Sequence, residues 1–175
     1  MSYPYVFIVA VATALLLTPV IRKFALASGA LSHPGARSVH TKPTPHMGGL
    51  AIYLAFFVAV VWAFGVGNRT TWGILLGGLV ILVVGIIDDC ISLSPRLKLA
   101  GQVLAALILV AFGIRIDLIT NPLNGGMLPL GWLAVPLTLL WVVAMTNILN
   151  LIDGLDGLAA GIAAIAAMRR HGRQR

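Results

Sequence analysis

Residues 71–89 read TWGILLGGLVILVVGIIDD, an uncharged and mostly apolar run that ends in two adjacent aspartates. A helix needs about twenty mostly apolar residues to cross the hydrocarbon core of a bilayer. The run 71–87 therefore predicts a transmembrane helix, and Asp88 and Asp89 are expected where that helix reaches a membrane surface.

The composition of the whole chain supports a membrane protein. Of 175 residues, 59% are hydrophobic and 10% are charged, whereas about a quarter of the residues in soluble domains are charged. The apolar fraction excludes a disordered chain, and the single cysteine excludes a disulfide scaffold. We expect an all-α, polytopic integral membrane protein with five complete transmembrane helices and a truncated sixth. The four further spans are predicted at residues 5–21, 47–64, 99–114 and 128–149.

The distribution of basic residues predicts the orientation. Segments 22–46 and 88–98 carry six Lys and Arg residues, and the alternate segments 65–70 and 115–127 carry two. The positive-inside rule then places the N-terminus outside and the first two segments in the cytoplasm. The net charge of +7 fits anionic lipid and an anionic substrate, with no nucleic acid partner. Asp117, in the external segment, is expected to be solvated.

The end of the chain departs from this pattern. Residues 157–167 are uncharged but too few to span a bilayer, and a polar tail with four arginines follows Met168. A sixth span would carry these arginines outside, against the charge rule. We expect residues 1–168 to be the N-terminal half of a multi-span membrane domain, and residues 169–175 to be a basic tail that results from truncation or a frameshift.

Residues 33–49 form a predicted cytoplasmic loop with three prolines and three glycines. Its basic and imidazole side chains could bind phosphate oxygens. The alternative is a loop whose positive charge only fixes the topology. Several such groups between prolines favour an anion site; they are Arg37, His40, Lys42 and His46.

Placing the adjacent acids Asp88 and Asp89 at the end of a membrane span costs free energy. One carboxylate at the end of a span is unfavourable, and a second beside it adds repulsion. A divalent cation relieves both costs, and Mg²⁺ takes carboxylate oxygens together with substrate phosphates. The alternative is that Asp88 and Asp89 extend into water as an interfacial cap. We favour a functional site.

A third polar cluster follows the fifth predicted span. Asn147, Asn150, Asp153 and Asp156 recur every three residues, so on a helix they would form a polar stripe. For the two asparagines, hydrogen bonds between helices are an equally good interpretation. Two carboxylates are not needed for such bonds, so Asp153 and Asp156 indicate a site. The Asp-Gly pairs suggest that the helix opens there.

Three motifs in this order resemble the polyprenyl-phosphate N-acetylhexosamine-1-phosphate transferases, also called glycosyltransferase family 4. The stretch LKLAGQ at 97–102 resembles the bacterial UDP-GlcNAc:undecaprenyl-phosphate GlcNAc-1-phosphate transferases. The resemblance covers about residues 30–165. The motifs are Pro34…Arg37…His40…Pro43-x-Pro45-x-x-Gly48-Gly49, Gly85-x-x-Asp88-Asp89-x-x-x-Leu93, and Asn147-x-x-Asn150-x-x-Asp153-Gly-x-Asp156-Gly-Leu.

The resemblance implies an enzyme of the bacterial cytoplasmic membrane whose active site faces the cytoplasm. Undecaprenyl phosphate would attack the β-phosphorus of UDP-GlcNAc, releasing UMP, as the first membrane step of cell-envelope polysaccharide synthesis. Mg²⁺ is the implied cofactor, with Mn²⁺ as the alternative. The lipid bilayer is a partner, and pairing into a homodimer is expected.

The resemblance also assigns roles to residues of this chain. Asp88 and Asp89 would be catalytic, orienting or deprotonating the lipid phosphate. Asp89, Asp153 and Asp156 would bind the metal. The implied substrate-binding residues are Arg37, His40, Lys42, Asn147, Asn150 and Asp153.

Two departures from the family pattern stand out. Ser92 occupies a position where the family often has a third acid. Family members usually have about ten or eleven spans, and their later loops carry another aspartate and a histidine-rich motif. We therefore expect the chain to be inactive alone.

Other functions were weighed against this one. An intramembrane prenyltransferase also uses two Asp-rich segments and Mg²⁺, but its motifs are not found here. The Asp-Gly-x-x-Ala-Arg run of the CDP-alcohol phosphotransferases is missing too. A cation-coupled transporter would place its polar groups near the middle of the bilayer, whereas these cluster at one surface.

Overall fold

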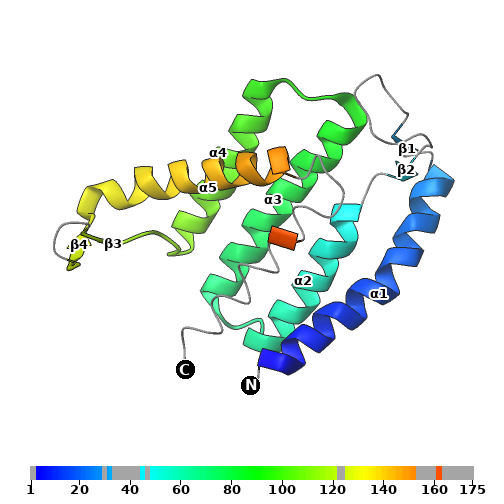
Figure 1. Ribbon diagram of the computed structural model, residues 1–175, viewed down its shortest axis with the longest axis horizontal. Coiled ribbons are helices and arrows are strands. Elements are labelled where there is room, and N and C mark those ends of the chain that lie inside the picture. Colours follow the sequence, from blue (N-terminus) through cyan, green and yellow to red (C-terminus); the bar gives the residue numbers. More distant parts are fainter. Residues whose placement is uncertain are drawn as a thin grey trace.

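A computed structural model describes residues 3–28, 31–32, 44–45, 48–121, 125–152 and 161–162. This part of the chain is mostly helical (Figure 1). Its long helices are α1 (Tyr3–Ser28), α2 (Gly48–Phe64), α3 (Arg69–Ile91), α4 (Pro95–Ala111) and α5 (Ala134–Ile152).

Each predicted span falls largely within one of these helices, but the count of five complete spans is not confirmed. Within the part of the chain that the structure describes, three helical segments are long and apolar enough to cross a membrane: Pro4–Ala27, Arg69–Ile91 and Gly131–Ile152. Helices α2 and α4 have 17 residues each, and α4 carries Arg96 and Lys98 near its start. The structure thus shows a mostly helical chain with three candidate spans.

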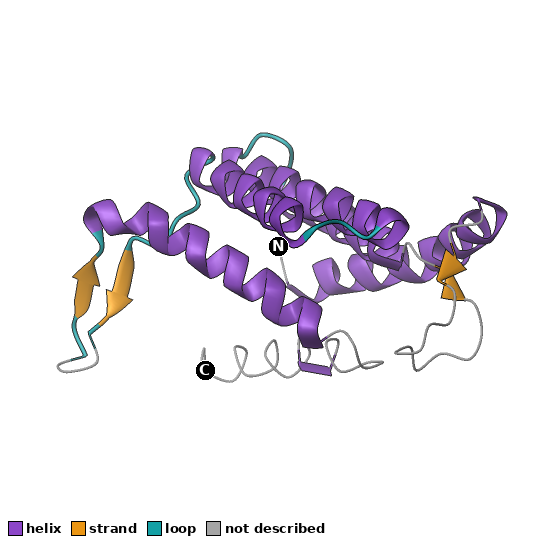
Figure 2. Ribbon diagram, turned by 90° about the horizontal axis from the view of Figure 1, so that it is seen from above, coloured by secondary structure: helices purple, strands orange, loops and turns teal. Residues whose placement is uncertain are grey.

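Short strands lie in the predicted loop 22–46 and in segment 115–129, so the helix of the fifth predicted span begins after residue 128, where the span was expected to start. Strand β1 (Leu31–Ser32) pairs with β2 (Thr44–Pro45), and β3 (Leu118–Thr120) pairs with β4 (Met127–Pro129), both antiparallel. The β3–β4 hairpin projects from the bundle beside the start of α5, before which stands a short 3₁₀ helix, η1 (Gly131–Leu133) (Figure 2).

Small residues let the helices approach one another. Helix α2 buries Ala51, Ala55 and Ala59, which lie four residues apart on one face. A Cβ atom on Gly73 of α3 would lie 2.5 Å from Phe112 Cβ, and one on Gly101 of α4 would lie 2.5 Å from Val84 Cγ2. Because lipid is as apolar as leucine, helices in membranes associate through such close contacts.

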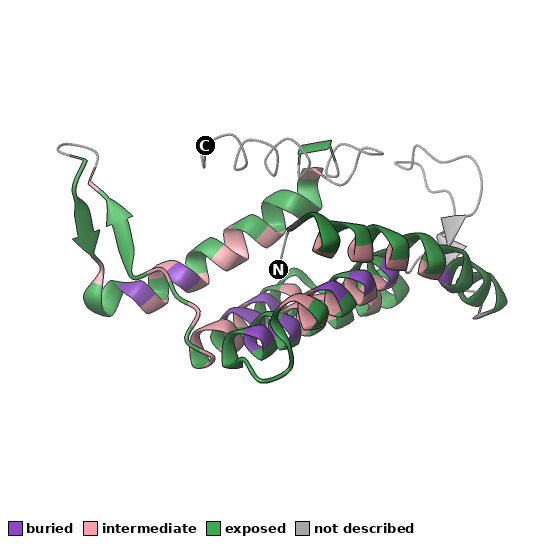
Figure 3. Cartoon of the chain, turned by 90° about the horizontal axis from the view of Figure 1, so that it is seen from below, coloured by how far each residue is buried: buried purple, intermediate pink, exposed green. Residues whose placement is uncertain are grey.

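Most large apolar side chains point outward. Leu15, Leu16 and Trp132 are among many that are more than two thirds exposed, and buried positions form narrow stripes along the helices (Figure 3). A water-soluble domain would bury these side chains. This surface suits contact with lipid.

Helices α3 and α4 form an antiparallel hairpin, and α5 crosses α4 at a wide angle (Figures 1 and 2). The hairpin has two distinct ends. We call the one with Asp88, Asp89, Ser92 and Lys98 the acid end, and the one with Asn68, Arg69, Phe112 and Arg115 the far end.

Candidate functional site

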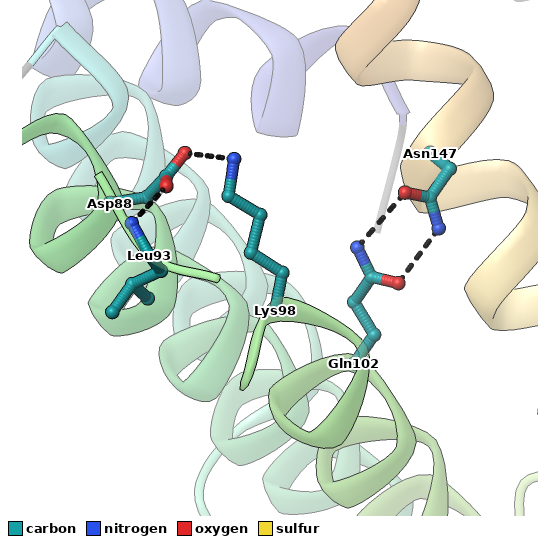
Figure 4. Close-up of polar contacts among 5 residues, drawn as sticks. All are labelled: Asp88, Leu93, Lys98, Gln102 and Asn147. Atoms are coloured by element: carbon teal, nitrogen blue, oxygen red, sulfur yellow. Dashed lines mark hydrogen bonds and ion pairs between the residues drawn. The ribbon is translucent and has the colours of Figure 1, made fainter. Parts of the chain in front are cut away.

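Asp88 ties the end of α3 to the start of α4 (Figure 4). Its Oδ1 accepts a hydrogen bond of 2.9 Å from the Leu93 amide, and its Oδ2 lies 2.7 Å from Lys98 Nζ. Its backbone carbonyl accepts a bond of 2.8 Å from the Ser92 amide. Both carboxylate oxygens of Asp88 are therefore used to hold the α3–α4 turn.

The local sequence explains the sharpness of this turn. Ser92 is left-handed, with φ 50°, as is common just after a helix, although glycine usually takes that position. Ser94 is extended, and Pro95 begins α4, where its fixed φ suits the first helical position. Ser92, at the position where the resemblance implied a third acid, thus ends α3.

Asp89 has a different environment. Its side chain is exposed and borders a groove of about 460 Å³ between α2 and α3. Apart from Asp89 and the ring of Tyr53, the groove is lined by glycine and apolar residues. The Tyr53 hydroxyl donates a bond of 2.8 Å to the Leu75 carbonyl, which joins α2 to α3. The groove is therefore mostly apolar, and its carboxylate lies at the acid end of the hairpin.

Helix α4 presents a second polar residue one turn beyond Lys98. Gln102 is buried, with 8% of its surface exposed. Its side chain and that of Asn147 on α5 exchange hydrogen bonds, 2.7 Å from Asn147 Nδ2 to Gln102 Oε1 and 3.4 Å from Gln102 Nε2 to Asn147 Oδ1 (Figure 4). Asn147 Nδ2 also donates to the Val143 carbonyl at 2.8 Å.

The structure therefore brings Asp88, Asp89 and Asn147 to one region of the bundle. Asn147 forms hydrogen bonds between helices, which was one of the two interpretations of this residue. Its role in substrate binding stays a prediction. Asn150, one turn further along α5, is exposed. The other predicted site residues lie outside the described residues: Arg37, His40, Lys42, His46, Asp153 and Asp156, as does the predicted tail 169–175.

Sequence reasoning missed two residues of this region. Lys98 counted there as a charge that sets the topology, and both Lys98 and Gln102 counted only as part of a resembling stretch, without a role of their own. The available signal was their spacing, because a lysine and a glutamine four residues apart share one face of a helix that is apolar from Val103 onward.

Of the three residues predicted to bind the metal, the structure describes only Asp89. Among the described residues, no cluster of three or more metal-binding side chains is found. Carboxylate oxygens are suitable Mg²⁺ ligands, and Asp89 borders the groove while both carboxylate oxygens of Asp88 are engaged by Lys98 and Leu93. Binding by Asp89, Asp153 and Asp156 together stays a prediction.

Comparison with known proteins gives consistent matches. The family model described as glycosyl transferase family 4 matches residues 71–169. A Bacillus subtilis protein named probable undecaprenyl-phosphate N-acetylglucosaminyl 1-phosphate transferase is 44% identical over 145 residues, covering 82% of this chain and 40% of that protein.

More distant relatives agree. A Mycolicibacterium smegmatis protein named decaprenyl-phosphate N-acetylglucosaminephosphotransferase is 35% identical over 140 residues, 74% of this chain and 34% of that protein. An Anaeromyxobacter phospho-N-acetylmuramoyl-pentapeptide-transferase is 35% identical over 137 residues, 61% and 36% of the two chains. The chain thus spans 40% or less of the length of these relatives. No solved structure matches it.

Proposed function

The chain belongs to glycosyl transferase family 4, and we propose that it serves the transfer of N-acetylglucosamine 1-phosphate from UDP-GlcNAc to undecaprenyl phosphate, with release of UMP. The observation that carries this proposal is the acid pair, in which Asp88 is fixed by Lys98 while the exposed Asp89 borders an apolar groove. The name of the Bacillus subtilis relative supports the same acceptor and sugar.

The proposed reaction is a phosphoryl transfer. An oxygen of undecaprenyl phosphate attacks the β-phosphorus of UDP-GlcNAc, and the bond from that phosphorus to the UMP oxygen breaks. Such reactions depend mainly on positioning and on neutralising phosphate charge, with little covalent help from the protein. A lipid phosphate is already ionised near neutral pH, so Asp89 need not act as a strong base.

We assign different tasks to the two acids. Asp89 faces the reacting phosphates and holds the metal, together with Asp153 and Asp156. Asp88 acts as a positioning residue, because Lys98 and the Leu93 amide hold its carboxylate. Members of the family need a divalent metal, and we propose Mg²⁺, which would neutralise phosphate charge when bound.

The acceptor and the nucleotide sugar need separate places. The groove between α2 and α3 offers an apolar wall to the first isoprene units, with its acid end open to the lipid phosphate. We assign the nucleotide sugar to Arg37, His40 and Lys42 of the first loop and to Asn150 and Asp153. The charge distribution supports a cytoplasmic site in a bacterial inner membrane, with the N-terminus outside.

A hybrid enzyme tests this function. This chain would replace the matching 145 residues of the Bacillus subtilis relative, whose remaining length supplies the later segments. Membranes with the hybrid should exchange radiolabelled UMP into UDP-GlcNAc when undecaprenyl phosphate is present, and EDTA should stop the exchange until Mg²⁺ is added. A hybrid present in the same folded amount as its active parent, but without exchange, would contradict the proposal.

A further inference from the structure

Lys98 and Gln102 lie four residues apart on α4 and hold two different helices. Positions four apart share one face of a helix, and both side chains project from that face (Figure 4). Lys98 pairs with Asp88 of α3, and Gln102 pairs with Asn147 of α5. Helix α4 thus connects the acid end of the hairpin to α5 through two polar side chains on one face.

Close packing of α4 against α5 does not by itself require a hydrogen-bonded pair such as Gln102–Asn147. Gln102 is buried beside Ala105 and Ala106, where an amide without partners would be costly. Helix α2 buries only alanines on its corresponding face, so small apolar residues suffice for close packing. The two amides satisfy each other instead, and their bonds are directional in a way that alanine contacts are not.

Direction matters at this contact because of how α5 is placed. Helix α5 crosses α4 rather than running along it (Figure 1), and near its start Thr138 Oγ1 accepts a hydrogen bond of 2.9 Å from the Ile116 amide. A pivot of α5 about that point would move the end that carries Asn147. A reciprocal amide pair at the crossing limits that pivot. Asn150 lies one turn beyond Asn147 on α5, so its distance from Asp88 and Asp89 depends on this angle.

We propose that Gln102 is a positioning residue for the transfer reaction. Through Asn147 it sets the direction of α5, and together with Lys98 it fixes the separation between the acid pair and Asn150. The inference rests on the proposed function, in which acceptor and nucleotide sugar must meet in line. A misplacement of about 1 Å can cost on the order of 100-fold in rate.

The first test measures the position of α5 in this chain itself. One spin label is attached to Cys90, the single cysteine, which lies beside the acid pair, and the other to Leu151→Cys, which is 82% exposed near the end of α5. Pulsed EPR in lipid nanodiscs gives the distance distribution. Gln102→Leu should broaden it, and the swap Gln102→Asn with Asn147→Gln, which keeps the combined length of the two side chains, should narrow it again.

Thr146→Val is the matched control. Thr146 lies beside Asn147, but its hydroxyl donates at 2.8 Å to the Val142 carbonyl of the same helix. Valine has nearly the same shape, so this variant removes a hydroxyl whose hydrogen bond lies within α5 and leaves the Gln102–Asn147 pair in place. Its distance distribution should equal that of the unchanged chain.

The second test measures kinetics in the hybrid enzyme. Gln102→Leu should lower kcat per folded enzyme by about 10- to 100-fold, with the KM for UDP-GlcNAc changed by less than about threefold. The swap should restore most of the loss. A merely structural role would reduce the amount of folded enzyme and leave kcat per folded enzyme unchanged.

The outcomes separate this inference from the proposed function. An unchanged distance distribution in Gln102→Leu overturns the positioning role, whatever the hybrid does. A broadened distribution with unchanged kcat also overturns it, because α5 would then move without effect on the reaction. An inactive parent hybrid counts against the transferase function alone, since the distance measurement does not need activity.

Discussion

The two ends of the α3–α4 hairpin use polar side chains in different ways. At the far end, Asn68 Oδ1 accepts from the Thr70 amide at 2.9 Å, Arg69 Nη2 donates to the Ala111 carbonyl at 2.7 Å, and Arg115 and Asp117 form an exposed ion pair. At the acid end, Lys98 pairs with the Asp88 carboxylate at 2.7 Å, and the exposed Asp89 borders a groove.

This difference separates what a helix needs from what a site needs. Every helix end leaves backbone groups without partners, and in lipid these must be satisfied within the protein. The far end does this with caps. At the acid end, the Leu93 amide bond to Asp88 meets the same need, but Lys98 and Asp89 exceed it. Because the far end also carries the charged residues Arg69, Arg115 and Asp117, the acid end is distinguished by a part-buried carboxylate that pairs with Lys98 and by a second carboxylate that borders the groove.

The largest expected effect on UMP exchange is that of a substitution at Asp89, which tests whether the acid end holds the site. Asp89→Asn in the hybrid enzyme should lower UMP exchange by about 1,000-fold, as expected when a group that stabilises transition-state charge is removed. Asp117→Asn, which removes a carboxylate 2.8 Å from Arg115 near the far end, should leave exchange unchanged. Near-normal exchange by Asp89→Asn would remove this acid from the mechanism.

The next effect concerns stability at Asp88. Asp88→Ala removes a charged hydrogen bond and an ion pair from a side chain that is 22% exposed, and should lower the free energy of unfolding by about 1.5 to 3 kcal/mol. The exposed Arg115–Asp117 pair is the control, and Asp117→Ala should cost about 0 to 1 kcal/mol. Unfolding of this chain in detergent micelles measures both. Equal costs would mean that the two ends do not differ.

A matched pair of glycines sharpens the comparison. Ala at Gly101 would press on Val84 Cγ2, and Ala at Gly73 would press on Phe112 Cβ, each at 2.5 Å. Both variants should lose about 1 to 3 kcal/mol of stability from overpacking. Only Gly101→Ala, next to Gln102, should also lower exchange per folded hybrid enzyme. A similar loss in Gly73→Ala would show that any distortion of the hairpin reaches the site.

The smallest effect is that of a simple cap. Asn68→Ala removes the side-chain acceptor for the Thr70 amide and should cost about 1 kcal/mol of unfolding free energy. Exchange per folded enzyme should stay the same, because this cap begins α3 at the end of the hairpin away from the acid pair. A clear loss of exchange would contradict the division between the two ends.

Much of the fold could be predicted from hydropathy. Each predicted span lies largely in one helix because the backbone must satisfy its own hydrogen bonds in lipid. The lengths of the helices were harder to predict. Helices α2 and α4 have 17 residues each, and the charged residues near the start of α4 shorten its apolar part. Segment 115–127 was expected as a loop, but part of it pairs in β3–β4. Asp117 is exposed, as expected, though Arg115 pairs with it.

The candidate site could be predicted only in part. Asp88 and Asp89 stand out because carboxylates are rare beside an apolar run. The partners of Asp88 could not be predicted, since Lys98 reaches it only because the turn at 92–94 brings α4 back against α3. In the same way, Gln102 meets Asn147 only because α5 crosses α4.

The sequence by itself determined that this chain forms apolar helices and that one of them ends in two carboxylates, because both facts depend on local composition. Only the tertiary structure decided how those carboxylates differ. Neighbouring residues on a helix point about 100° apart, so Asp88 faces Lys98 of α4 while Asp89 borders the groove beside α2. Which side each acid faces depends on the neighbouring helices, and no local pattern encodes their placement.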